Sequence, residues 1–166
     1  ALACDEMLRL ANALSCPVEV NIFYRTPERM EAILTHMNER KTELGLNVPV
    51  LGHAPDARIP GLKGPRAACH SDGILGSDAI LVPLEDGDRC QALVAMGKEV
   101  IVIDLNPLSR SAQQATITIV DELSRALTSM LNLADVEGQI QSDPGYDHVA
   151  VLEEGLSEML NTMKKP

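Results

Sequence analysis

The chain of 166 residues carries a formal net charge of −10, and hydrophobic residues make up 45% of it, which suffices to bury the core of one globular domain. The acidic charge argues against sequence-independent nucleic-acid binding, which needs a basic face. Aromatic residues are only 2% of the chain, so the core must be aliphatic, and stacking platforms for single-stranded nucleic acid are nearly absent.

Neither a membrane span nor a signal peptide is expected. No apolar run reaches the roughly 18 residues that a transmembrane helix needs, and no basic stretch precedes an apolar one near the start. The four cysteines form no C-x-x-C pair, which disfavours a zinc site and favours buried thiols in a reducing compartment. We therefore expect a cytoplasmic protein.

The first 51 residues predict two helices and two strands. Residues 1–14 have helical spacing without a preceding cap, so we expect that residues are missing upstream. A strand is predicted over 18–24. Thr26 and Pro27 then suit the cap and first position of a helix that stops near Gly45. A short strand over 48–51 follows.

Residues 52–77 predict a long loop, because Pro and Gly cluster between 59 and 66. His53 and His70 lie in this loop, where an exposed or core position is a better interpretation than a metal site. The next strand covers 79–84, and a helix runs from the following acidic segment to Gly97. That segment contains three carboxylates, which could cap the helix or hold Mg²⁺ through water. They are Glu85, Asp86 and Asp88.

Residues 100–103 form a β-branched apolar run, which predicts a strand buried on both faces and ended by Asp104 and Pro107. A polar loop over 109–111, a strand over 116–120, a helix over about 121–134 and a linker from 137 to 145 follow. The last helix has apolar residues spaced 3, 4, 3, 4, a seam typical of helix pairing or of docking on the chain's own sheet. The seam residues are Val149, Leu152, Leu156, Met159 and Met163.

Alternating strands and helices predict a three-layer, Rossmann-like α/β domain with a mostly parallel sheet over residues 1–136. Residues 137–166 are expected to be a linker and a helix that packs on the domain or on a partner subunit. No strand is followed by G-x-G-x-x-G or by G-x-x-x-x-G-K-[ST]. These absences leave a dinucleotide site of the usual dehydrogenase type, and a Walker P-loop, without support.

Polar residues follow the two strands at 100–103 and 116–120, where ligands of open parallel sheets bind. The first site candidates are Asp104, Asn106, Arg110 and Ser111. The alternative is that Asp104 and Asn106 only close Asx turns and that Asp121 only caps a helix. Arg25 lies at a strand-to-helix junction and can contact an anion or be an ordinary exposed arginine.

Five segments carry a resemblance to one family. They are Val82–Arg89, Ile103–Ser111, Ala115–Asp121, Val20–Thr26 and Ile59–Leu62. The segments closely resemble the archaeal phosphopantothenate synthetases, also called 4-phosphopantoate–β-alanine ligases. The similarity runs from about residue 2 to residue 133, and Asp-Leu-Asn-Pro-Leu-Ser-Arg is its most specific motif.

The resemblance implies that the protein joins 4-phosphopantoate to β-alanine at the expense of ATP, in coenzyme A biosynthesis. An acyl-adenylate would form, with release of pyrophosphate and then AMP, and Mg²⁺ would accompany ATP. Arg110 and Asn106 would be catalytic, and Arg25 would contact the substrate. The nucleotide contacts carried over by motif are Asp104, Leu105, Asn106, Arg110, Ser111, Glu122 and Leu123.

Two departures from the family accompany this resemblance. Members usually carry Asn where this chain has Glu122, and they have a longer N-terminal helical region, with arginines that contact ATP, which we expect is missing here. The competing hypothesis is a non-catalytic nucleotide- or phosphometabolite-binding domain; a dehydrogenase-like domain is a weaker one. We expect a homodimer, with no nucleic-acid or membrane partner.

Overall fold

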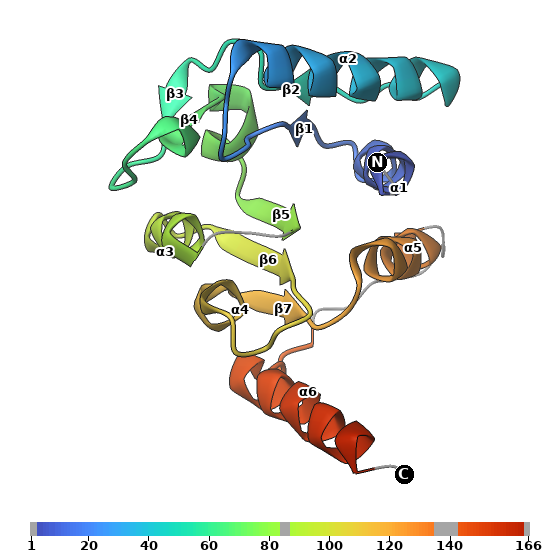
Figure 1. Cartoon of the computed structure of the whole chain (residues 1–166), viewed down its shortest axis with the longest axis vertical. Helices are drawn as coiled ribbons and strands as arrows, with labels where there is room; N and C mark the ends of the chain where they lie inside the picture. The colour runs from blue at the N-terminus through green and yellow to red at the C-terminus, as the bar shows by residue number, and fades with distance from the viewer. Residues whose placement is uncertain (1–2, 84–86, 135–142, 165–166) are drawn as a thin grey trace. The chain divides into compact units, whose positions relative to one another are not determined.

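The computed structural model describes residues 3–83, 87–134 and 143–164. By its internal contacts the chain divides into two compact units, each of which is discontinuous in sequence. The first comprises Ala1–Ser77 and Ser124–Glu137, and the second comprises Asp78–Leu123 and Gly138–Pro166. Figure 1 shows the order of their helices and strands. The division expected from the sequence, at residue 136, stays a prediction.

The first unit is built on a short parallel strand pair and the helices around it. Its larger elements are α1 (Cys4–Ala13), β1 (Val18–Glu19), α2 (Pro27–Glu43), β2 (Val50–Leu51) and most of α5 (Leu123–Ala134). Val18 pairs with Val50, and Glu19 with Leu51. An aliphatic core of side chains from α1, from α2 and from the residues around β1 includes Leu8, Val20 and Leu34.

The predicted helix after Thr26 is confirmed, and its ends have the expected chemistry. The Thr26 hydroxyl oxygen accepts a hydrogen bond from the Arg29 amide at 3.4 Å, and Pro27 is the first helical residue. The helix ends before Gly45, whose φ of +66° is the left-handed conformation that closes helices. Met30 and Leu34 are each 7% exposed, so this face of α2 packs in the core.

The prediction of one long loop over residues 52–77 is wrong. Strand β3 (Ala57–Arg58) pairs antiparallel with β4 (Ala68–Cys69), next to a 3₁₀ turn at Pro65–Ala67 and a π-helical turn at Ser71–Leu75. The region is ordered by side chains distant in sequence. Asn21 donates to the carbonyl oxygens of Arg66 and Ala68, and the Glu19 carboxylate accepts from the amides of His70 and Ile74.

The second unit is built on a three-stranded parallel sheet. Its elements are β5 (Ala79–Pro83), α3 (Gly87–Ala95), β6 (Glu99–Ile103), α4 (Arg110–Gln114), β7 (Ile117–Ile119) and α6 (His148–Met163). The order is β5-β6-β7, so β6 is central, and Val102 pairs with both Val82 and Thr118. Val100 and Val102 are fully buried, as the β-branched run predicted.

These elements confirm the predicted fold class, a mixed α/β protein with mostly parallel strand pairing. The antiparallel β3–β4 ribbon is an addition to it. Among the described residues, no helix has the length and apolar character needed to cross a membrane.

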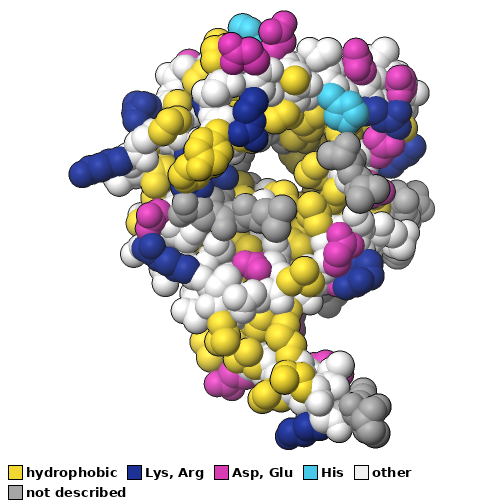
Figure 2. All heavy atoms as spheres, in the orientation of Figure 1, with side chains coloured by type: hydrophobic (Ala, Val, Ile, Leu, Met, Phe, Trp, Pro, Cys, Tyr) yellow, Lys and Arg dark blue, Asp and Glu magenta, His cyan; other side chains and the backbone are white. Residues whose placement is uncertain are grey.

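Helix α6 docks on β7 of its own unit through its N-terminal half. Of the five seam residues, Leu152 is buried, at 8% exposure, while Val149 and Met163 are 61% and 82% exposed. Hydrophobic side chains on α6 reach the surface in Figure 2. The start of the helix is held by His148, whose Nε2 donates to the Ala112 carbonyl at 2.8 Å. Helix α6 therefore contacts its own sheet. Leu156 is partly buried, and Val149, Met159 and Met163 are exposed. Packing on a partner subunit stays a prediction.

Candidate functional site

The carboxyl ends of β6 and β7 meet in the second unit, and the predicted site residues follow them directly. The Asp104 amide donates to the carbonyl oxygen of Ile119 at 3.1 Å, which ties the end of β6 to the end of β7. Parallel strands with this order place the loops that follow them at one edge of the sheet. Residues 104–111 after β6 and residues 120–123 after β7 therefore belong to the same edge.

Asp104 organises the first loop through its carboxylate. Oδ1 accepts from the Asn106 amide at 2.9 Å, and Oδ2 accepts from the Ser109 hydroxyl at 2.5 Å. Asn106 repeats the arrangement, because its side-chain oxygen accepts from the Leu108 amide at 3.0 Å. Both residues therefore close Asx turns, as the alternative interpretation expected. Their contact with a ligand stays a prediction. The side chains of Asp104 and Asn106 thus shape the loop. Asn106 is nevertheless exposed, and the side chain of Leu105 is 61% exposed.

The predicted polar loop over residues 109–111 is wrong, because these residues begin a short helix. The Ser109 hydroxyl oxygen accepts from the Ala112 amide at 3.0 Å and thereby caps α4, in which Arg110 is the first residue. Ser111 is only 4% exposed, and its carbonyl accepts a long hydrogen bond from the Cys90 thiol at 3.7 Å. Ser111 thus helps to pack α4 against α3.

Arg110 is held by the helix that follows the neighbouring strand β5. Its Nη1 lies 2.6 Å from Oδ1 of Asp88, and its Nη2 donates to Oε1 of Gln91 at 3.1 Å. The arginine and aspartate side chains remain 59% and 60% exposed. The sequence indicates Asp88 as a helix cap or Mg²⁺ ligand, whereas in the structure it forms an ion pair with Arg110. This pairing spans more than twenty residues, and no sequence pattern could have indicated it.

Potential metal ligands are scattered in the described part of the chain. Within residues 3–83, 87–134 and 143–164, no three His, Cys, Asp or Glu side chains come together as a metal-binding group. Glu85 and Asp86, which the sequence offered together with Asp88, lie outside the described residues.

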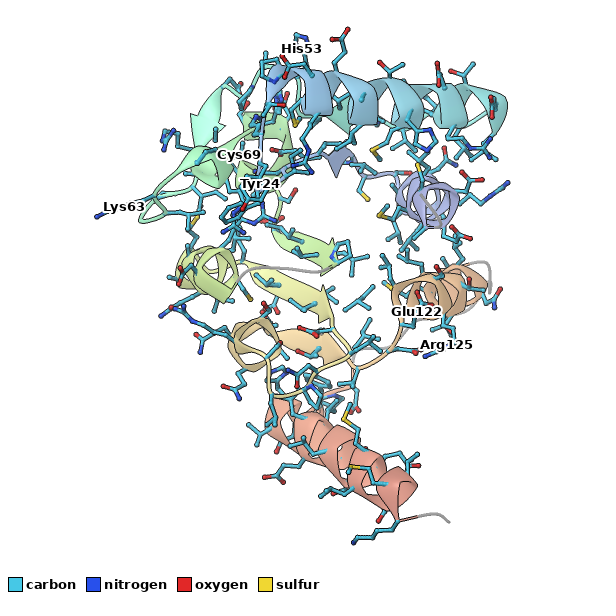
Figure 3. All side chains as sticks on the ribbon, viewed as in Figure 1. Tyr24, His53, Lys63, Cys69, Glu122 and Arg125 are labelled. Atoms are coloured by element: carbon cyan, nitrogen blue, oxygen red, sulfur yellow. The ribbon has the colours of Figure 1, made fainter. Side chains whose placement is uncertain are left out.

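Glu122 and Leu123 follow β7 and are partly buried. The Glu122 amide donates to Oδ1 of the preceding Asp121 at 2.7 Å, so Asp121 stabilises the turn that leads into α5. Figure 3 shows Glu122 at this connection between β7 and α5. All seven predicted nucleotide contacts thus belong to the second unit, in the two loops at the carboxyl edge of its sheet and the α4 turn that continues the first loop.

Arg25 belongs to the first unit, at the β1–α2 connection. Its Nη2 makes a short hydrogen bond to the Gly52 carbonyl, and its Nη1 is buried without a hydrogen-bond partner among the described residues. Arg25, Thr26 and His53 line a cavity of about 1100 Å³ together with one face of α2. Because Nη1 itself is buried, an anion or a water in the cavity could pair with it only after neighbouring side chains move.

The N-terminus of α2 is already capped by residues of the chain itself. Thr26 caps it, and hydrogen bonds from the backbone amide of Glu28 and from Thr26 hold the pKa of the Glu28 carboxyl below its usual value. A carboxylate at this position satisfies the positive end of the helix dipole. Arg25, rather than the helix terminus, is therefore the group that remains available for an anion.

Comparison with known proteins agrees with the resemblance found in the sequence. The family model described as phosphopantothenate/pantothenate synthetase matches residues 1–162. Proteins named 4-phosphopantoate–β-alanine ligase from Thermococcus onnurineus and Thermococcus kodakarensis are 50% and 48% identical over 134 residues. Each match covers 81% of this chain and 50% of the relative. A protein of the same name from Methanosarcina mazei is 42% identical over 99% of this chain and 65% of its own length.

This chain thus spans between half and two thirds of the length of these relatives. The family model covers nearly all of it, and Asp104–Ser111, which contain the most specific motif of the resemblance, follow the carboxyl end of β6 in a parallel sheet. The chain belongs to the phosphopantothenate/pantothenate synthetase family.

Proposed function

We propose that the protein is an ATP-dependent ligase that condenses 4-phosphopantoate with β-alanine to 4′-phosphopantothenate, with release of AMP and pyrophosphate. Family membership and the names of the relatives support the ligation. The structural observation that carries the nucleotide part of the proposal is the loop and helix turn from Asp104 to Ser111. This segment lies at the carboxyl edge of a parallel sheet, the usual ligand position in such folds.

The reaction proceeds in two steps, both of which balance without a redox partner. The carboxylate of 4-phosphopantoate attacks the α-phosphorus of ATP, forming an acyl-adenylate as pyrophosphate leaves. The neutral amine of β-alanine then attacks the acyl carbon, AMP leaves, and the amine proton passes to solvent or a base. Because the acid and the nucleotide are both anions, the chain's task is to position them and to stabilise phosphoryl charge.

Asp104 and Asn106 act as the scaffold of the nucleotide loop, since their carboxylate and amide oxygens are used in its turns. The exposed faces of Leu105 and Asn106 are then available to the nucleotide, with Asn106 also assigned to catalysis. Arg110 supplies a permanent forked cation that suits phosphate. Ser111, Glu122 and Leu123 complete the proposed nucleotide contacts. Glu122 would contribute through its main chain, because a carboxylate repels phosphates.

Arg25 is the proposed contact for the acid substrate. Its orientation is set by the Gly52 carbonyl, and it lines the cavity beside α2. The phosphate or the carboxylate of 4-phosphopantoate is the group that it would contact. Mg²⁺ is proposed to arrive with ATP, as a partner of the phosphates. We also propose that the protein is a homodimer that functions in the cytoplasm.

The test is a reaction of the full-length gene product with ATP, 4-phosphopantoate and β-alanine. The proposal requires AMP formation that depends on both other substrates. ADP as the product would indicate an acyl-phosphate route instead. ATP binding without turnover would favour the alternative of a non-catalytic binding domain.

Within that assay, Arg110→Ala should reduce turnover on the order of 100-fold, while weakening ATP binding less. Arg110→Lys should recover only part, because a point charge cannot replace the fork. Arg125→Ala, which removes an exposed arginine of α5, is the control and should cost little. A rate for Arg110→Ala within a few-fold of wild type would remove Arg110 from the mechanism.

A further inference from the structure

The first residue of α3, Gly87, lies directly against the side chain of Arg110. A Cβ atom placed on Gly87 would come within 2.5 Å of Cγ and within 2.8 Å of both Cβ and Cδ of Arg110. Contacts this short do not occur between real side chains. The atoms concerned include the base of the arginine stem, so rotating the guanidinium away would not relieve them.

Backbone conformation does not explain this glycine. Gly87 has no positive φ, unlike Gly45 or Gly97, so any residue could adopt its helical backbone. The position is also buried. Glycine is therefore required here for space, and the occupant of that space is the stem of Arg110.

The guanidinium end of Arg110 is held from the same helix. Nη1 forms an ion pair with Oδ1 of Asp88 at 2.6 Å, and Nη2 donates to Oε1 of Gln91 at 3.1 Å. A guanidinium has five N–H groups, so others can still donate to a further acceptor.

We propose that Gly87, Asp88 and Gln91 form a cradle that fixes the orientation of Arg110 before the nucleotide binds. This inference rests on the proposed role of Arg110 at the ATP phosphates, and it assigns three positioning residues to that role. A long side chain that is 59% exposed would otherwise sample many rotamers. Holding it in one of them in advance means that little ordering remains to be done in the transition state.

The competing interpretation is that Asp88 only neutralises Arg110 and must be displaced by the phosphates. The two interpretations predict different kinetic effects of removing the Asp88 carboxylate. If the cradle orients Arg110, loss of Asp88 lowers kcat. If Asp88 competes with phosphate, its loss lowers the KM for ATP and leaves kcat unchanged or higher.

The experiment measures AMP-forming kinetics of Gly87→Ala and Asp88→Asn in the full-length gene product, alone and combined with Arg110→Ala. Gly87→Ala should lower kcat about tenfold, and Asp88→Asn roughly two- to fivefold, since an exposed ion pair contributes little more. In the Arg110→Ala background both effects should vanish, because the cradle acts only through that side chain. Gly155→Ala in α6 is the matched control, as its added Cβ would meet Val120 at an ordinary 3.6 Å.

A second readout does not need turnover. The NMR order parameter of the Arg110 Nε–Hε group should fall in both cradle variants and stay unchanged in the control. Unchanged order and unchanged kcat in Asp88→Asn would overturn the cradle, even if Gly87→Ala failed to fold. A lower ATP KM with intact kcat would also overturn it. If Arg110→Ala left kcat unchanged, the proposed role of Arg110 would be wrong. If Arg110→Ala lowered kcat but the cradle variants did not, the role of Arg110 would stand and only the cradle would be wrong.

Discussion

Replacing Asp104 by alanine tests whether its carboxylate builds the loop after β6. The change removes the acceptors for the Asn106 amide and the Ser109 hydroxyl. The second loss spreads further, because the same Ser109 oxygen caps α4 through the Ala112 amide. One substitution thus loosens the turn and the helix that presents Arg110.

The expected loss of stability follows from these bonds. A hydrogen bond to a charged group contributes about 1.5–3 kcal/mol when it is shielded from solvent. Asp104 is partly exposed, so water recovers part of both bonds, and we expect a net cost of about 2 kcal/mol. For a chain of this size, that corresponds to a drop in Tm of about 4–8 °C. Asp104→Asn keeps one acceptor oxygen for the Asn106 amide and should cost about half as much.

The assay is thermal unfolding followed by circular dichroism, in parallel with AMP formation. Asn106→Ala is the comparison, since it removes one neutral and more exposed bond, to the Leu108 amide, and should cost less than 1.5 kcal/mol. A Tm within about 1 °C of wild type for Asp104→Ala would refute the scaffold role. Loss of turnover in Asp104→Asn without loss of stability would instead indicate a direct nucleotide contact.

Three further outcomes are expected. Gly155→Ala should raise the free energy of unfolding by about 0.5–1 kcal/mol, because alanine restricts the unfolded chain and its Cβ has room, as urea unfolding can show. The hydrogen bond from Arg40 lowers the pKa of the Asp5 carboxyl, so the pair stabilises the fold above the unfolded pKa near 3.9 and loses this effect as the pH falls through the lower folded value. Asp5→Asn should therefore reduce the loss of unfolding free energy at acidic pH. An unchanged dependence of stability on acidic pH would contradict the assignment. Met159→Glu with Met163→Glu should dissociate a dimer that uses the exposed part of α6, and sedimentation showing an unchanged oligomer would exclude that surface.

The parts of the fold that could be predicted are those with a strong local signal. The β-branched run 100–103 became the central strand, and Thr26–Pro27 opened α2, because burial and capping act through neighbouring residues. Strands β3 and β4 are two residues each, too short for any periodicity. Their ribbon is held by Asn21, more than forty residues away, so the surrounding sequence could only indicate a loop.

The candidate site divides in the same way. Its residue list came from a motif, and the Asx turns at Asp104 and Asn106 follow from local chemistry. Helix α4 was missed although Ser109 is a good cap, because five residues carry no helical repeat. The ion pair of Arg110 with Asp88 depends on two helices that follow adjacent strands. Only the pairing of those strands brings the two residues together.

The interleaving of the two units has a consequence for biosynthesis. The chain leaves the first unit at Ser77, returns to it at Ser124, and leaves it again before Gly138. During synthesis, neither unit is complete when its first segment leaves the ribosome. The first unit still lacks α5, whose Leu127 is almost fully buried, and the second unit still lacks α6. A truncation at residue 77 would remove α5 as well as the second unit. No single cut therefore separates the two units, and a gene for either unit alone would have to join its two sequence segments.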